Sequence, residues 1–319
     1  MDWDKCKDQY NNKQLFEEHY LCMKLVNLSY NPQDDYKVPF DIGITIGYNG
    51  VAGPMNPIWF CVVNDQKKAV YICVRGSRDI LDVYSDLKSN VIDFYGCPSH
   101  QGFVEGGRTI FDNFPWDKLE PCIKKGYSFL FTGHSLGGAC AAIATIEFYQ
   151  KYRDTKLKCV TFGCPGVLTP DYAQQWYPVI DSIFHIGDPI PFACNHNLFT
   201  PKSGVNFLGA LAGALKESEY FPLHFLDSKA REDVSPDYEL LLPPGRYFAI
   251  GLTTTGDLKV VEYQGVDFFD GLQSFLVQSG HLIKFYVSTY DRLYDEKVKG
   301  TKSSFKEHVN LPVDFTPTR

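Results

Sequence analysis

A serine flanked by glycines, between a predicted strand and a predicted helix, constrains the fold more than any other feature of the chain. The pentapeptide Gly133-His134-Ser135-Leu136-Gly137 follows an apolar run at 127–132 and precedes a run rich in small residues at 136–152. The glycines remove side chains that would clash where the chain folds sharply. We therefore expect Ser135 to be held in a strained turn that presents its hydroxyl above the edge of a sheet.

The remaining sequence alternates between strand and helix patterns. Strand patterns lie at 45–48, 58–64, 68–75, 127–132, 157–163, 182–186, 246–252 and 258–263, and helical patterns lie at 13–30, 81–89, 102–113, 136–152 and from about His281 to Tyr290. Strands separated by helices pair in parallel through right-handed crossovers. The sequence therefore predicts an α/β fold with a mostly parallel central sheet and helices on both faces.

No Pro/Gly/Ser-rich linker or repeat divides the 319 residues, so we expect one domain over 1–319. The pattern of alternating strands and helices loosens after Asp188, which predicts an insertion.

The net charge is −7 without a basic block, which excludes a nucleic-acid partner. The longest uncharged stretch, Ile42 to Asn64, holds too many glycines, prolines and asparagines for a membrane span.

The chain opens without the basic and apolar regions of a secretory signal, so we expect a cytoplasmic protein, with secretion as the alternative. Its ten cysteines show no metal-site spacing, and Cys61, Cys73, Cys140 and Cys159 lie within apolar runs. These cysteines are typical of reduced core residues. The sequence carries no P-loop, HExxH or dinucleotide motif, so we expect no cofactor and no metal.

A serine hydroxyl is a poor nucleophile without a base, so the motif requires a carboxylate and then a histidine further along the chain. Asp188 follows the strand at 182–186 at its carboxyl end, where ligand and catalytic groups gather in such sheets. Asp181 is the rival, but it precedes that strand and would lie at the wrong edge. A purely structural alternative is that Asp188 caps a tight turn and has no catalytic role.

Three of the eight histidines satisfy the order and position of a base, His196, His224 and His281. His281 fits best, because it follows the last two predicted strands and precedes an apolar helix. His196 lies only eight residues after Asp188, and His224 lies in the predicted insertion. We therefore expect a triad of Ser135, Asp188 and His281.

Six short motifs follow one another in a fixed order. They are Val74-Arg75-Gly76-Ser77, Asp82 with Asp86-Leu87, His100-Gln101-Gly102-Phe103, Gly133 to Gly138, Thr161-Phe162-Gly163-Cys164-Pro165, and Asp188-Pro189-Ile190-Pro191. Over roughly residues 15–290 the chain thereby resembles the class 3 lipases, the fungal triacylglycerol-lipase and diacylglycerol-lipase type of α/β-hydrolase.

The resemblance implies a serine carboxylic-ester hydrolase that cleaves acylglycerols or related lipids. By the same match, the amides of Ser77 and Leu136 form the oxyanion hole, and Asp188 and His281 complete the triad. Residues 78–85 stand where the family carries a lid, with an ordinary amphipathic helix as the alternative. The span before His281 is longer than in the fungal enzymes, which puts the insertion at about 198–237. Within it, the apolar run 205–215 fits a membrane-docking element, an acyl-chain wall or a buried helix.

Three functional alternatives stay open at this stage. The same triad fits a phospholipase or a small-ester esterase, because pocket shape decides the substrate. The fold also serves as a noncatalytic interaction module in some proteins, since fold alone does not determine function. For the lipase we expect a lipid or ester substrate and peripheral contact with a membrane or lipid-droplet surface.

Overall fold

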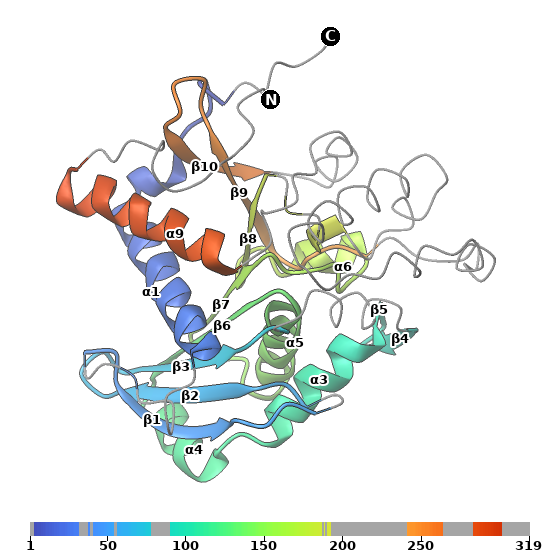
Figure 1. Ribbon diagram of the computed structural model, residues 1–319. Coiled ribbons are helices and arrows are strands. Elements are labelled where there is room, and N and C mark those ends of the chain that lie inside the picture. The colour runs from blue at the N-terminus through green and yellow to red at the C-terminus, as the bar shows by residue number, and fades with distance from the viewer. Residues whose placement is uncertain are drawn as a thin grey trace, which may run out of the picture.

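One eight-stranded sheet forms the centre of the molecule (Figure 1). The computed structural model describes residues 3–31, 38, 41–53, 56–77, 90–186, 188, 190–192, 241–263 and 283–301. In spatial order the strands are β1 (Ile44–Asn49), β2 (Trp59–Asn64), β3 (Ala69–Val74), β6 (Ser128–His134), β7 (Leu157–Phe162), β8 (Ile180–His185), β9 (Arg246–Leu252) and β10 (Leu258–Tyr263). A separate hairpin pairs β4 (Val91–Phe94) with β5 (Cys97–His100).

The middle of the sheet is parallel and its margins are antiparallel. Strands β3, β6, β7, β8 and β9 run in one direction. The hairpins β1–β2–β3 and β9–β10 close the two sides. This confirms the predicted α/β fold with a mostly parallel sheet, and it gathers the carboxyl ends of the parallel strands at one edge.

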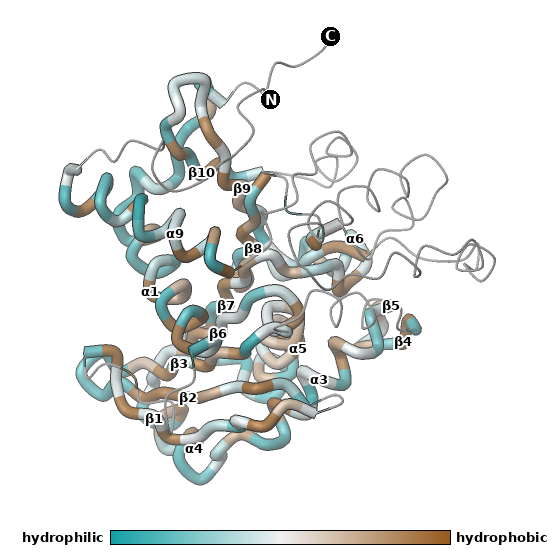
Figure 2. Tube along the Cα trace, viewed as in Figure 1, coloured by the Kyte–Doolittle hydropathy of each residue, from teal (hydrophilic) through white to brown (hydrophobic). Residues whose placement is uncertain are grey.

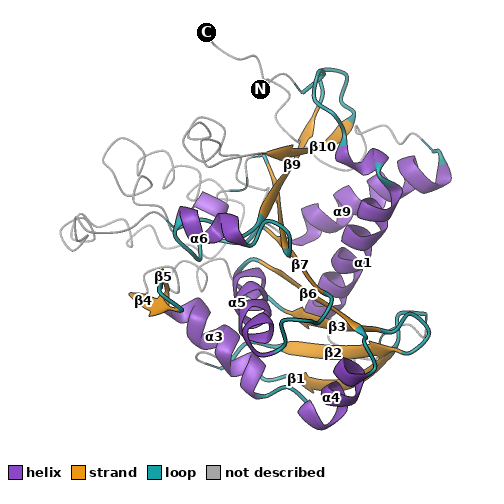
Figure 3. Cartoon of the chain, turned by 180° about the vertical axis from the view of Figure 1, so that it is seen from behind, coloured by secondary structure: helices purple, strands orange, loops and turns teal. Residues whose placement is uncertain are grey.

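Helices cover both faces of the sheet (Figures 1 and 3). One face carries α1 (Lys13–Tyr30) and α9 (Ile283–Tyr294), and the other carries α3 (Gln101–Asp112), α4 (Trp116–Lys124), α5 (Leu136–Lys151) and α6 (Pro170–Gln175). Shorter turns lie at η1 (Gln9–Asn11), η3 (Ile190–Phe192) and η8 (Asp295–Lys299). None of the helices in these described ranges is long and apolar enough to cross a bilayer.

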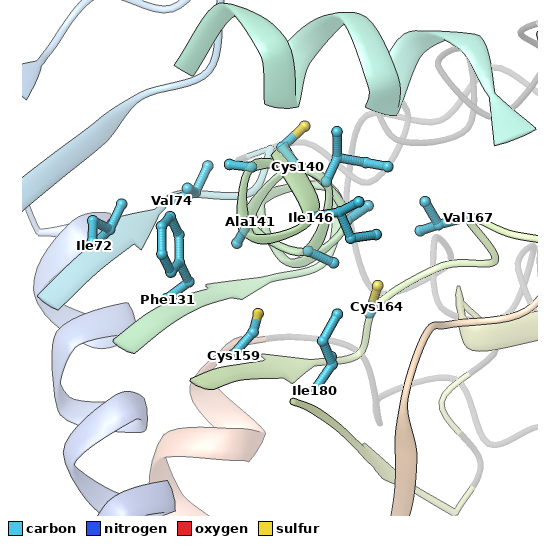
Figure 4. Close-up of a cluster of buried hydrophobic side chains, with 14 of the residues drawn as sticks. Ile72, Val74, Phe131, Cys140, Ala141, Ile146, Cys159, Cys164, Val167 and Ile180 are labelled. Atoms are coloured by element: carbon cyan, nitrogen blue, oxygen red, sulfur yellow. The ribbon is translucent and has the colours of Figure 1, made fainter. Parts of the chain in front are cut away.

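Alternate residues of the central strands supply two hydrophobic cores. In β3, Ile72 and Val74 face α5, whereas Tyr71 and Cys73 face α1 and α9. Every residue of β3 is buried, as expected for a strand covered on both faces. Figure 4 shows the α5 side, where Ile72, Val74 and Phe131 point from the strands toward that helix. Hydrophobic residues run along β2, and hydrophilic residues mark the outer loops (Figure 2).

Most predicted elements are confirmed within a few residues, and β9 and β10 have the predicted bounds. Strand β8 begins at Ile180, so Asp181 lies inside it rather than before it. The sequence analysis missed the β4–β5 hairpin, α6 and α4, which contains Pro121. The predicted helix at 81–89 and the predicted insertion at 198–237, with its apolar run 205–215, lie outside the described residues.

Candidate active site

Ser135 occupies the sharp turn between β6 and α5 that the sequence predicts. Its backbone has φ 58° and ψ −135°, a left-handed conformation that a residue with a Cβ adopts only under strain. Three backbone hydrogen bonds hold the turn: Ser135 N–H donates to the Phe162 oxygen at 2.8 Å, and the Ser135 oxygen accepts from Gly138 and Ala139 at 2.9 and 3.2 Å. Ser135 is itself only 1% exposed.

The glycines beside Ser135 are required by close backbone contacts. A Cβ on Gly133 would lie 2.4 Å from the oxygen of Gly137, and a Cβ on Gly137 would lie 2.5 Å from the oxygen of Val74. Both distances are too short for any side chain. Helix α5 therefore starts directly against the ends of β3 and β6, with its amino end beneath the serine.

The segment after β3 runs against the serine turn. A Cβ on Gly76 would lie 3.1 Å from the Cβ of Ser135 and 2.4 Å from the oxygen of His134. Ser77, the next residue, is half-buried. Leu136 is the first residue of α5, and the first amides of a helix lack partners within the helix. The two segments that the sequence analysis assigned to the oxyanion hole thus flank Ser135.

Asp188 lies beyond the carboxyl end of β8, at the edge of the sheet that also carries Ser135. Its side chain is fully buried, and its two oxygens accept different hydrogen bonds. Oδ1 accepts from Ile190 N–H at 2.9 Å, and Oδ2 accepts from the Tyr286 hydroxyl at 2.7 Å. A carboxylate held through both oxygens has a defined orientation, so Asp188 does more than cap a turn.

Tyr286 on α9 is the functional neighbour that the sequence analysis missed. Burial, together with the charge of Asp188 and the hydrogen bond to it, raises the pKa of Tyr286 well above its ordinary value, so the hydroxyl remains a donor. The ring also packs edge-on against His185 and His134, with centroid distances of 4.6 and 5.4 Å. The position of Tyr286 in the helix after His281 was the only hint in the sequence that it lies near the site. No motif distinguishes it from an ordinary core tyrosine.

His134 connects the serine turn to the surroundings of Asp188. Its ring contacts Tyr286, and its Nδ1 lies 2.9 Å from the hydroxyl of Tyr30 on α1. Burial lowers the pKa of the nearby His185 to about 4, although the Asp188 carboxylate opposes this shift. Both faces of the sheet therefore contribute to the same edge: α5 beneath Ser135, and α1 and α9 around His134.

The predicted base, His281, lies outside the described residues, as do His196, His224 and the predicted lid at 78–85. The described chain resumes at Ile283, the first residue of α9. Tyr286, one turn into α9, reaches Asp188. The structure thus brings together the surroundings of Ser135, Ser77, Leu136 and Asp188, and the assignment of His281 stays a prediction.

Asp181, the rival carboxylate, is engaged elsewhere. It sits near the amino end of β8, where Arg246 Nε and Lys158 Nζ each lie 2.9 Å from Oδ1, and His19 Nε2 lies 3.0 Å from Oδ2. Burial alone would raise the pKa of Asp181, but the hydrogen bonds from His19 and Arg246 and the charge of Lys158 hold it well below its usual range. Asp181 thus lies at the end of β8 opposite to the edge that carries Ser135.

Among the described residues, Glu18, His19 and Asp181 form a group whose side-chain atoms could surround a metal ion. Asp181 already binds Arg246, Lys158 and His19, and the positive charge of Arg246 and Lys158 opposes a further cation. We therefore interpret Asp181, with His19, Lys158 and Arg246, as a buried ion network.

Comparisons with known proteins show which family and which solved structures this chain is similar to. The profile of the lipase (class 3) family matches residues 71–197. A lipase of Rhizopus niveus is 30% identical over 117 residues, which cover 34% of this chain and 30% of that protein. The chain thus spans less than a third of the length of this curated relative.

Two solved structures have the same α/β-hydrolase fold. The lipase of Rhizopus microsporus var. chinensis superposes with a TM-score of 0.58 at 18% identity, covering 87% of this chain and 88% of that one. A triacylglycerol lipase whose catalytic centre is a serine protease triad superposes with a TM-score of 0.59 at 16% identity, covering 87% and 95%. The match over residues 71–197 and the similar lipases support the resemblance to the class 3 lipases that the sequence motifs predict.

Proposed function

We propose that the chain is a serine hydrolase that cleaves carboxylic esters of acylglycerols or related lipids through an acyl-enzyme. Ser135 is the nucleophile, His281 is the general base and Asp188 orients the imidazole. The amides of Leu136 and Ser77 bind the oxyanion. The observation that carries this proposal is the strained turn of Ser135 at the start of α5. Asp188 lies buried at the same edge of the sheet, and each of its two oxygens accepts a hydrogen bond.

The reaction proceeds in two steps. His281 removes the hydroxyl proton as Ser135 Oγ attacks the ester carbonyl, and the tetrahedral intermediate expels the alcohol, which takes that proton from the imidazolium. Water activated by His281 then attacks the acyl-enzyme and releases the acid. Each oxyanion donor commonly contributes about 3 kcal/mol to transition-state stabilisation. The amino end of α5 adds a favourable dipole at the same place.

The lipid substrate is supported by relatives rather than by a pocket. The similar Rhizopus niveus protein is a lipase, and the similar solved structure is that of a triacylglycerol lipase. Lipid esters gather at water interfaces, so the protein makes peripheral contact with a membrane or lipid droplet in this proposal.

In this proposal the protein also resides in the cytoplasm, where thiols stay reduced. Eight of the nine described cysteines are buried, as expected for small apolar core residues.

The test compares the purified protein with Ser135→Ala on a panel of p-nitrophenyl esters, mono-, di- and triacylglycerols and phospholipids. We expect hydrolysis by the wild type and a loss of at least about 10⁴-fold in the variant. The ranking of substrates separates a lipase from a phospholipase and from a small-ester esterase. Ester hydrolysis that survives Ser135→Ala, or a wild type inactive on the whole panel, would overturn the proposal.

Thiol trapping in native cells tests the compartment. Free cysteines throughout the chain are expected, and predominantly paired cysteines would contradict a cytoplasmic location. Co-sedimentation with triolein droplets or phospholipid vesicles tests the interfacial contact, and a protein that remains in the supernatant with both would contradict it.

A further inference from the structure

A line of buried hydrogen bonds leads away from Asp181 on the α1 and α9 face of the sheet. His19 Nε2 lies 3.0 Å from Asp181, and His19 Nδ1 lies 2.9 Å from the hydroxyl of Tyr10. The Tyr10 hydroxyl in turn contacts that of Tyr290 on α9. All four side chains are at most 2% exposed. The line therefore joins β8 to α9 through α1 and η1, entirely within the core.

One arrangement of protons satisfies every group in this line. Tyr290 donates to Tyr10, Tyr10 donates to the Nδ1 lone pair of His19, and His19 donates from Nε2 to Asp181. Buried hydrogen bonds linked in this way polarise one another, and losing one leaves a partner unsatisfied. Arg246 and Lys158 fix the far end, because both bind the same carboxylate.

The same helix holds Asp188. Tyr286 and Tyr290 are four residues apart, so they lie one above the other on one face of α9. Tyr286 binds Asp188 beyond the carboxyl end of β8, and Tyr290 is connected through Tyr10 and His19 to Asp181 near the amino end of that strand. Helix α9 is thus tied to β8 at two levels, and its first residue lies two positions after His281.

We propose that the line Asp181–His19–Tyr10–Tyr290 is a positioning network that sets the placement of α9 and, through Tyr286, the orientation of the Asp188 carboxylate. These four residues are buried and are proposed as positioning residues, and the inference rests on the proposed function of Ser135 and Asp188. A reacting group displaced by about 1 Å can cost about 100-fold in rate. Loosening α9 should therefore lower kcat and leave KM for a small substrate unchanged.

The decisive variant is Tyr290→Phe, which removes one hydroxyl and keeps the ring that packs against Phe162. We expect kcat on a soluble short-chain p-nitrophenyl ester to fall about tenfold, with KM within about twofold. The matched control is Tyr247→Phe. It removes a buried hydroxyl that donates to the Pro243 oxygen from β9, outside the network, and kcat should stay at the wild-type value. All assays are run well below the unfolding temperature of each variant, so that a loss of stability alone does not change kcat.

A double-mutant cycle separates positioning from a purely structural role. In a Tyr286→Phe background, Tyr290→Phe should lower kcat by less than about twofold, because the connection to Asp188 is already cut. Equal kcat losses in Tyr290→Phe and Tyr247→Phe, a wild-type kcat in Tyr290→Phe, or full additivity in the cycle would each overturn the network. Ser135→Ala is measured alongside: activity that survives it defeats the proposed function, whereas its loss together with a normal Tyr290→Phe defeats this inference alone.

Discussion

Ser135 adopts a backbone conformation that costs a residue with a side chain about 1–3 kcal/mol. Its surroundings keep it there. The turn is fixed by hydrogen bonds to β7 and α5, and α5 is buried from Gly137 to Phe148. Asp188 is likewise buried with a donor on each oxygen. The strained backbone of Ser135 and the buried carboxylate of Asp188 would each be unfavourable in isolation. The packing and hydrogen bonds of the surrounding core hold both residues in place.

A substitution at Gly76 tests how closely the segment that carries Ser77 must approach Ser135. In Gly76→Ala, the added methyl would meet the His134 oxygen at 2.4 Å and the Tyr30 hydroxyl at 2.5 Å, so the segment carrying Ser77 has to move. We expect kcat/KM for a short-chain ester to fall at least about tenfold. Gly53→Ala is the control, because its nearest neighbour would lie at an ordinary 3.6 Å. Wild-type kcat/KM in Gly76→Ala would contradict the described approach.

His185 should make stability depend on pH in mild acid. Burial lowers its pKa from 6.5 to about 4 in the folded chain, so the unfolded chain binds a proton first as the pH falls. The free energy of unfolding should therefore decrease between pH 7 and pH 4, by at most about 3 kcal/mol from this group. His185→Phe keeps a ring against Tyr286 and removes the titration.

Urea denaturation of both proteins across that range measures the His185 contribution as the difference between their curves. A wild type and a variant that lose the same free energy on acidification would show that His185 is not a buried neutral imidazole.

Helix α9 links the core to the site at the scale of secondary structure. Tyr286 and Tyr290 are buried against the sheet, and Tyr286 spans from the helix to the loop after β8. In Tyr286→Phe the Asp188 carboxylate loses one of its donors, and a hydrogen bond to a charged group is worth about 1.5–3 kcal/mol. We expect kcat to fall about tenfold at unchanged KM, measured with the same soluble ester. A kcat within twofold of wild type would show that the Tyr286 hydroxyl is not needed to orient Asp188.

The sequence predicts the elements that carry strong patterns. The run around Ser135 combines a buried strand, flanking glycines and small residues, and each of these features points to the same turn. Asp188 was predicted because a position after a parallel strand marks the edge where catalytic groups gather. Asp181, which the sequence analysis rejected, lies within β8 near its amino end rather than before the strand.

Contacts between distant segments were beyond the sequence patterns. Tyr286 meets Asp188 across 98 residues, and Tyr10 meets Tyr290 across 280. Nothing local distinguishes these tyrosines from others in apolar helices. The hairpin β4–β5 and helix α4 were missed for a related reason: both are short, and their stability comes from packing on α3 and the sheet rather than from local periodicity.

Across the whole molecule, the amino-terminal segment closes over the sheet margin formed by β9 and β10. Lys259 Nζ donates to the oxygens of Trp3 and Asp4 at 2.9 Å and of Cys6 at 3.3 Å. Lys297, after α9, binds Asp8. The first residues of the described chain thereby tie the last strand to the region following the last helix.

Lys259→Met should weaken this closure without disturbing the site. We expect the free energy of unfolding to fall by about 1–3 kcal/mol, because three carbonyl groups lose a charged donor, while kcat is retained. Lys284→Met, on the exposed side of α9, should change the stability by less than about 0.5 kcal/mol. Urea denaturation compares the two variants. Equal effects would show that the contacts of Lys259 add nothing to the fold.

Covalent labelling with a fluorophosphonate, read by peptide mass spectrometry, tests the central claim most directly. We expect one adduct per molecule, on Ser135, absent in Ser135→Ala and formed about 10³–10⁴-fold more slowly in Asp188→Asn, where the imidazole loses its orienting carboxylate. Folded wild-type protein that forms no adduct, or an adduct on another residue, would contradict the assignment of Ser135 as an activated nucleophile.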